Sequence, residues 1–93
     1  MSRFELRLSS VDALLTDTVM LNEKLNLLIN RTNLKNAKEV VEVANGISMQ
    51  LSMLSGAIPL DLKARWIDLE EYEILVSKLE NVKSILAMLG WEE

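Results

Sequence analysis

Cysteine and histidine are both absent from this chain of 93 residues. Without cysteine there is no disulfide, thiolate metal site or cysteine nucleophile, and nothing indicates an oxidising compartment. Without histidine the chain lacks the usual group for proton transfer near neutral pH and a common zinc ligand. We therefore predict a protein that is not an enzyme, with no catalytic residues, no metal site and no cofactor.

Long apolar runs and basic clusters are also missing. The longest apolar run, from Ile85 to Leu89, is far shorter than the ~20 residues that cross a bilayer. The first eight residues mix charged with apolar side chains, unlike a secretory signal, so we expect a cytoplasmic protein with no membrane span. Acids outnumber bases by 14 to 10, and the bases are scattered, which argues against direct binding of nucleic acid.

Aliphatic residues at helical spacing are the main positive signal. Hydrophobic residues make up 49 % of the chain and aromatic residues only 4 %. Three stripes recur in alternating steps of three and four, which places each stripe on one face of a helix. The stripes are Val11, Leu14, Thr18, Leu21, Leu25, Leu28; then Ala37, Val40, Ala44, Ile47, Leu51, Leu54; then Tyr72, Leu75, Leu79, Val82, Leu86, Leu89.

Residues with capping and breaking properties set the expected helix ends. Residues 3–8 fit a helix, an ordered arm or a strand paired across a dimer, so the first helix starts after Ser2 or near Ser10. Residues 55–59 (Ser-Gly-Ala-Ile-Pro) should end the second helix, because proline disfavours helix at the residue before it. Asp68 and Glu71 have the spacing of a capping box, and Gly90 is a stop signal.

These signals predict one all-α domain over residues 1–93, an antiparallel three-helix bundle either with or without a short fourth helix around residues 60–67. The expected helices cover about residues 10–31, 34–55, 60–67 and 69–89, and residues 60–89 form either one helix or two. Apolar positions outside the three stripes exceed what a thin bundle covers. We therefore expect a homodimer or a protein partner to bury the remainder.

Methionine and tryptophan are the candidate partner-binding residues, because both are favoured at adaptable or energetically dominant contacts. The alternative interpretation places the methionines and Trp66 in the core, and Trp91 as a lid over the end of the bundle. The candidates are Met20, Met49, Met53, Met88, Trp66 and Trp91.

Acidic residues gather at the start of the expected last helix, where Glu70, Glu71 and Glu73 follow Asp68. Such a cluster suggests either a cation site or an acidic decoy of nucleic acid, which binds the basic groove of its target. Carboxylates in the first turn of a helix also interact favourably with the helix dipole, and we expect this structural role for the cluster.

Two short resemblances bear on function. Residues 25–34, with Arg31 between leucines, resemble the Leu-Leu-x-x-Arg-x-x-Leu stretch of small all-α chorismate mutases. That resemblance implies an enzyme with a cationic pocket, here from Arg7, Arg31 and Lys38, although Glu42 stands where the family has a lysine. The acidic helical chain is also similar to the small chaperones of type III secretion needle subunits, apart from its extra helix over residues 34–55.

The sequence as a whole favours a non-enzymatic module that binds another protein, itself, or both, through apolar helix faces. A small chaperone, an adaptor and an inhibitor are the classes that fit. The mutase-like enzyme and the acidic decoy are the alternatives.

Overall fold

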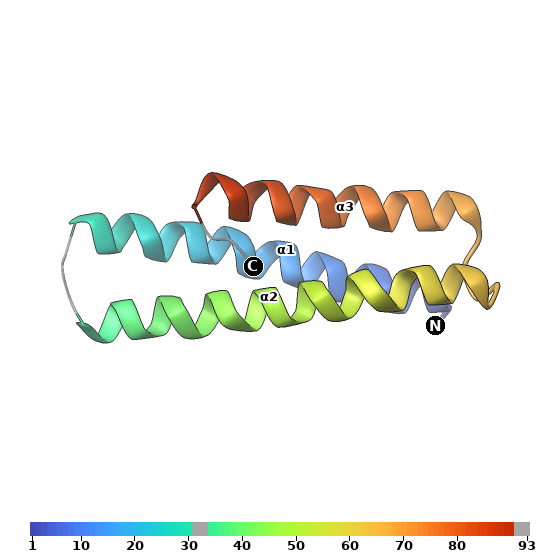
Figure 1. The fold of residues 1–93 in the computed structure, drawn as a ribbon, viewed down its shortest axis with the longest axis horizontal. Helices are drawn as coiled ribbons and strands as arrows, with labels where there is room; N and C mark the ends of the chain where they lie inside the picture. The colour runs from blue at the N-terminus through green and yellow to red at the C-terminus, as the bar shows by residue number, and fades with distance from the viewer. Residues whose placement is uncertain (31–33, 91–93) are drawn as a thin grey trace.

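A computed structural model describes the backbone of residues 1–30 and 34–90, and the side chains of residues 1–26 and 37–90. Three α-helices make up the structure: α1 (Arg3–Asn30), α2 (Leu34–Lys63) and α3 (Leu69–Met88). Each helix contacts the other two, and successive helices run in opposite directions along a bundle of 48 × 20 × 20 Å (Figure 1). The described residues contain no strand. The predicted all-α three-helix bundle is confirmed.

The three apolar stripes meet along the axis of this bundle. Thr18, the polar member of the first stripe, is also fully buried, and its hydroxyl donates a 2.8 Å hydrogen bond to the carbonyl of Leu14. This bond satisfies the hydroxyl without a partner from another helix. The buried apolar residues are Val11, Leu14 and Leu21 of α1, Val40, Ala44, Ile47, Leu51, Leu54 and Ile58 of α2, Ile67, and Leu75, Leu79, Val82 and Leu86 of α3.

Helix α1 starts at Arg3 rather than near residue 10. The Glu5 amide donates to Oγ of Ser2 at 3.1 Å, and the Ser2 hydroxyl donates to Oε1 of Glu5 at 3.2 Å. The Ser2 oxygen thereby satisfies one of the amides that a helix start leaves unpaired. Residues 3–8 are therefore helical, and the alternative of a strand does not apply.

Helix α2 continues past the predicted break and contains Pro59. Ile58 is fully buried and Asp61 is 2 % exposed, so a helix that ended at residue 55 would remove both from the core. Their burial outweighs the local preference of residues 55–59 for a turn. Residues 60–63 are consequently the last turn of α2 rather than part of a separate helix over 60–67.

The connection to α3 is a tight turn over residues 64–67. The Trp66 amide donates to the carbonyl of Asp61 at 2.9 Å, and Arg65 adopts a left-handed backbone with φ of 62°. The predicted capping box then starts α3: the Glu71 amide donates to Oδ1 of Asp68 at 2.8 Å, and the Asp68 amide to Oε1 of Glu71 at 3.0 Å.

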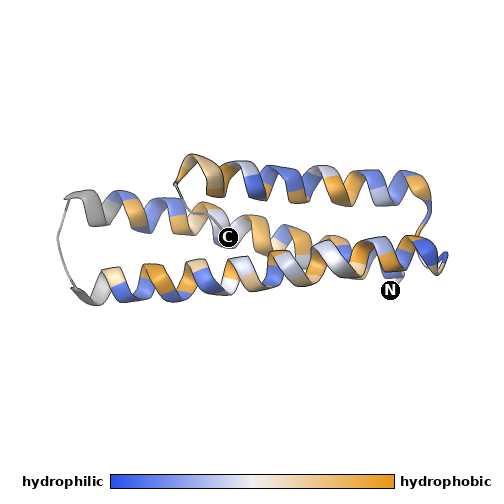
Figure 2. Ribbon diagram, viewed as in Figure 1, coloured by the Kyte–Doolittle hydropathy of each residue, from blue (hydrophilic) through white to orange (hydrophobic). Residues whose placement is uncertain are grey.

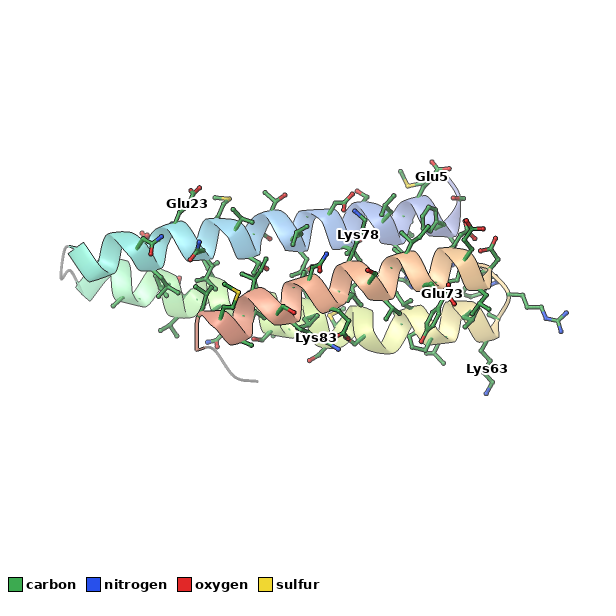
Figure 3. All side chains as sticks on the ribbon, turned by 90° about the horizontal axis from the view of Figure 1, so that it is seen from above. Glu5, Glu23, Lys63, Glu73, Lys78 and Lys83 are labelled. Atoms are coloured by element: carbon green, nitrogen blue, oxygen red, sulfur yellow. The ribbon has the colours of Figure 1, made fainter. Side chains whose placement is uncertain are left out.

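An ion pair joins the middle of α3 to α1. Nζ of Lys78 lies 3.0 Å from Oδ1 of Asp12, and Lys78 is labelled in Figure 3.

Candidate protein-binding surface

A buried ion pair joins α1 to the last turn of α2. Nε of Arg7 donates to Oδ2 of Asp61 at 2.6 Å, and a second guanidinium nitrogen lies 3.4 Å from Oδ1. Arg3 adds a longer contact, 3.9 Å, to the same carboxylate. Because Asp61 is almost inaccessible and Arg7 is oriented by it, this cluster fixes helix register rather than offering a charge to a ligand.

The cations of the mutase-like alternative do not converge in the described residues. Arg7 is neutralised by Asp61 near one end of the bundle. Lys38 is exposed, and it precedes Asp61 on α2 by a distance of roughly 35 Å at 1.5 Å per residue. Arg31 lies outside the described residues. The arrangement of Arg7 and Lys38 therefore provides no common pocket for an anionic substrate.

The acidic cluster has a structural role at the start of α3. Asp68 and Glu71 are used in the capping box, and Glu70 lies in the same first turn. Within the part of the chain that the structure describes, no group of three histidine, cysteine or acidic side chains is placed to hold a metal ion.

All four candidate methionines are exposed, so the interpretation that they fill gaps in the core is wrong. The aliphatic stripes already occupy the bundle axis, which leaves the methionines on the outside. Met49 and Met53 are 67 % and 68 % exposed, one helical turn apart on α2. Met20 of α1 and Met88, the last residue of α3, are also exposed.

Trp66 is exposed as well, which contradicts the alternative interpretation that places it in the core. Its side chain is 59 % accessible, and the guanidinium carbon of Arg3 lies 4.2 Å from the centre of its ring. The neighbouring Ile67 takes the buried position instead. The structure thus separates Trp66, before the start of α3, from Met88 at its end. Trp91 lies outside the described residues.

The outer side of α2 carries several exposed apolar side chains. Met49 and Met53 lie on it together with Leu60, which is 65 % exposed. Residues 43–60 of this helix contain no charged residue. Figure 2 shows that hydrophobic residues recur along the length of all three helices.

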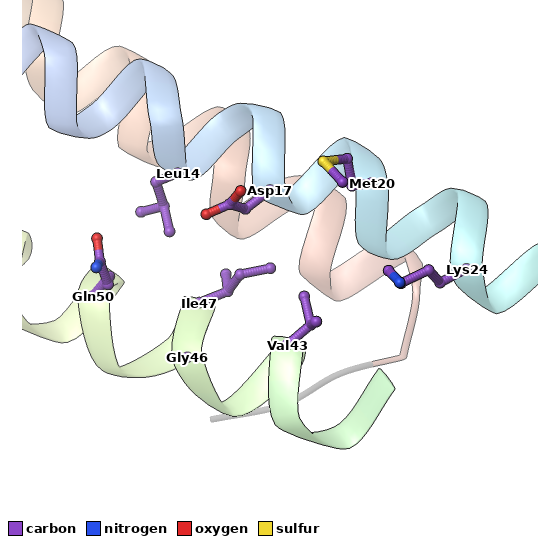
Figure 4. A pocket seen from close by; sticks show the side chains of 8 residues that line it. All are labelled: Leu14, Asp17, Met20, Lys24, Val43, Gly46, Ile47 and Gln50. Atoms are coloured by element: carbon purple, nitrogen blue, oxygen red, sulfur yellow. The ribbon is translucent and has the colours of Figure 1, made fainter. Parts of the chain in front are cut away.

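Two shallow grooves run between α1 and α2 beside this surface. The larger, about 290 Å³, is shown in Figure 4, where α1 contributes Asp17 and Met20 to one wall and α2 contributes Val43 and Gly46 to the other. A smaller groove of about 190 Å³ continues towards Arg7 and is lined by Met53 and other residues. Both are open hollows with mixed apolar and polar walls.

Comparison of the chain with protein-family models, with curated proteins and with solved structures gave no match. In the described residues, no helix is long and apolar enough to cross a membrane.

The sequence did not predict that Leu60 lies on the same side of a helix as Met49 and Met53. Leu60 was assigned to a separate short helix, and only the continuation of α2 through Pro59 brings it into line with Met49 and Met53. The uncharged stretch over residues 43–60 was the signal that could have found it, because the outward side of a solvent-exposed helix normally carries charges.

Proposed function

We propose that this chain is a non-enzymatic helical module that binds protein through the outer side of α2. The supporting observation is that Met49, Met53 and Leu60 lie on one side of a helix and are each about two-thirds exposed. Exposed apolar patches of this kind mark interaction sites in soluble proteins. Burying a side chain of this size fully contributes about 1.5–3 kcal/mol, which gives such a surface useful binding energy.

The chemistry of the chain supports a binding role in the cytoplasm. Methionine side chains adapt to different partner shapes, as in a chaperone, an adaptor or an inhibitor. The absence of cysteine fits a reducing compartment. The separated cations Arg7 and Lys38 and the capping role of the acids give less support to the enzyme and decoy alternatives.

A pull-down tests this proposal. The tagged wild-type chain is compared with a Met49→Gln, Met53→Gln variant, using a lysate of the source organism and mass spectrometry. Glutamine has a similar length and favours helix, so the variant should keep the fold while its surface becomes polar at both positions. We expect a protein retained by the wild type, either a different protein or untagged copies of the chain, to be missing from the variant.

Met88→Gln is the matched control, because Met88 is an exposed methionine on a different helix, at the end of α3. It should retain the same protein as the wild type. If the Met49→Gln, Met53→Gln variant retained this protein and Met88→Gln did not, the binding surface would lie elsewhere and the proposal would be contradicted. A wild-type chain that retains nothing would also contradict it.

A further inference from the structure

One exposed stripe on α2 has a nearly symmetric sequence. Gly46, Met49, Met53, Gly56 and Leu60 follow one another in steps of three and four, all of them exposed, on the solvent-facing side of α2, and Gly46 and Met53 also line the grooves next to α1. We call these five residues the outer stripe. Its centre reads glycine, methionine, methionine, glycine in either direction, with the level of residue 51 as the midpoint.

The two glycines have no explanation within the chain. A Cβ atom added at Gly46 or at Gly56 would have no atom within 4 Å. Glycine is among the poorest helix formers, so an exposed helix interior with room for a side chain favours other residues. Glycine on a helix surface does, however, let a second backbone approach closely. The missing contact is therefore with something outside this chain.

Charges extend the same register beyond both ends of the stripe. Glu42 lies four residues before Gly46, and Lys63 lies three residues after Leu60. In the described part of the chain neither side chain forms an ion pair, and Lys63 extends away from the bundle (Figure 3). The two residues are separated by roughly 32 Å of helix, so they cannot meet within one copy.

We propose that the outer stripe binds the outer stripe of a second copy of this chain, with the two α2 helices antiparallel. This inference rests on the proposed function, because it names the partner of the same surface. A two-fold axis level with residue 51 sets Gly46 against the partner's Gly56 and Met49 against the partner's Met53. It also brings Glu42 within one helical turn of the partner's Lys63, twice by symmetry.

Charge complementarity selects the antiparallel orientation and a second copy as the occupant. A parallel pair would set Glu42 against the partner's Glu42 and Lys63 against the partner's Lys63, which is repulsive. Lys38, one turn before Glu42, offsets part of the attraction, and Glu39 is already paired with Lys24 at 3.7 Å, so the attraction to the partner's Lys63 comes from Glu42. At the other end Lys63 and Arg65 are exposed, while Asp61 is buried against Arg7.

Charge reversal combined with solution mass tests the arrangement. Sedimentation equilibrium over a wide concentration range is measured for the wild type, Glu42→Lys, Lys63→Glu and the variant carrying both. We expect a dimer for the wild type, dissociation constants raised about tenfold in each single variant, and recovery to near the wild-type value in the double variant. Because Glu42 and Lys63 cannot meet within one copy, recovery reports contact between copies.

Two control variants separate the proposed contact from a general effect of charge and from misfolding. Lys83→Glu changes an exposed charge on α3 and should leave the dissociation constant unchanged. Gly46→Gln with Gly56→Gln improves helix propensity in open space, so the single chain stays folded while the close approach of two helices is blocked. That variant should be monomeric, with unchanged helical content by circular dichroism.

A wild-type chain that stays monomeric at every concentration would overturn the dimer, and so would a dimer that the double variant fails to restore. If the monomeric chain still retains a different protein through Met49 and Met53, the dimer is wrong and the proposed function stands. If it retains nothing, both fail.

Discussion

At the residue scale, the pair of Arg7 and Asp61 shows that a charged position can belong to an apolar stripe. Arg7 lies four residues before Val11, in register with the buried face of α1. Asp61 lies three residues after Ile58, in register with the buried face of α2. Opposite charges at the adjoining ends of two antiparallel stripes therefore predict a buried ion pair.

Removing one partner should destabilise the protein strongly. Asp61→Asn leaves Arg7 with a neutral amide, and we expect the free energy of unfolding to fall by about 3 kcal/mol, the lower end of the range for a broken buried pair. The lower end applies because Arg7 retains 21 % side-chain exposure. Urea unfolding followed by circular dichroism measures the change.

Two comparisons give this prediction its control. Replacing both partners, as Arg7→Met with Asp61→Leu, should recover most of the stability, because no unpaired charge is left. Lys83→Met removes an exposed pair with Glu80 and should change the stability by less than about 1 kcal/mol. An equal loss in all three variants would show that the Arg7–Asp61 pair has no special role.

At the element scale, the passage of α2 through Pro59 can be tested directly. Proline within a helix removes one hydrogen bond and disfavours helix by about 3 kcal/mol relative to alanine, while it also restricts the unfolded chain. Pro59→Ala should therefore raise the free energy of unfolding by roughly 2 kcal/mol, measured by urea unfolding. A helix that ended at residue 55 would gain nothing from this substitution, and a null result would contradict the observed course of α2.

The stripes and the start of α2 could be predicted from the sequence, but the last turns of α2 could not. Periodicity identified the buried positions within the three stripes, because core packing depends on which face a residue occupies, but it did not identify Ile58, Asp61 or Ile67. The break at residues 55–59 was predicted from local backbone preference, which the burial of Ile58 and Asp61 overrides.

The candidate surface was predicted only in part, for a similar reason. The spacing of four residues between Met49 and Met53 places them on one helix face, yet whether methionine lies inside or outside depends on how completely other side chains fill the core. The spacing of the methionines can be taken from the sequence, but their exposure depends on the three-dimensional packing of the other side chains. Leu60 lies on the same side of α2 as Met49 and Met53 because the helix continues through Pro59.

At the scale of the whole molecule, the helices have unequal lengths. α1 and α2 have 28 and 30 residues, whereas α3 has 20. In the described residues, α1 and α2 therefore extend past the end of α3, as Figure 1 shows at the side away from the α2–α3 turn. Residues 37–43 of α2 contribute one buried side chain, Val40, whereas residues 47–58 contribute Ile47, Leu51, Leu54 and Ile58.

Native-state hydrogen exchange should reflect this difference. We expect backbone amides in residues 37–43 to exchange on the order of tenfold or more faster than those in residues 47–58, because they open without unfolding the three-helix part. Exchange measured by NMR at several urea concentrations separates the two groups. Uniform protection along α2 would show that the bundle opens as one unit.

The ion pair of Arg7 with Asp61 also sets an order of events during synthesis. Arg7 is made early, and its carboxylate partner follows 54 residues later. Until Asp61 has been made, the stripe of α1 carries an unpaired positive charge, which disfavours burial of its first turns against any apolar surface. We therefore expect that end of the bundle to close only after most of α2 has been made, so that the register of α1 and α2 is selected when Asp61 is present.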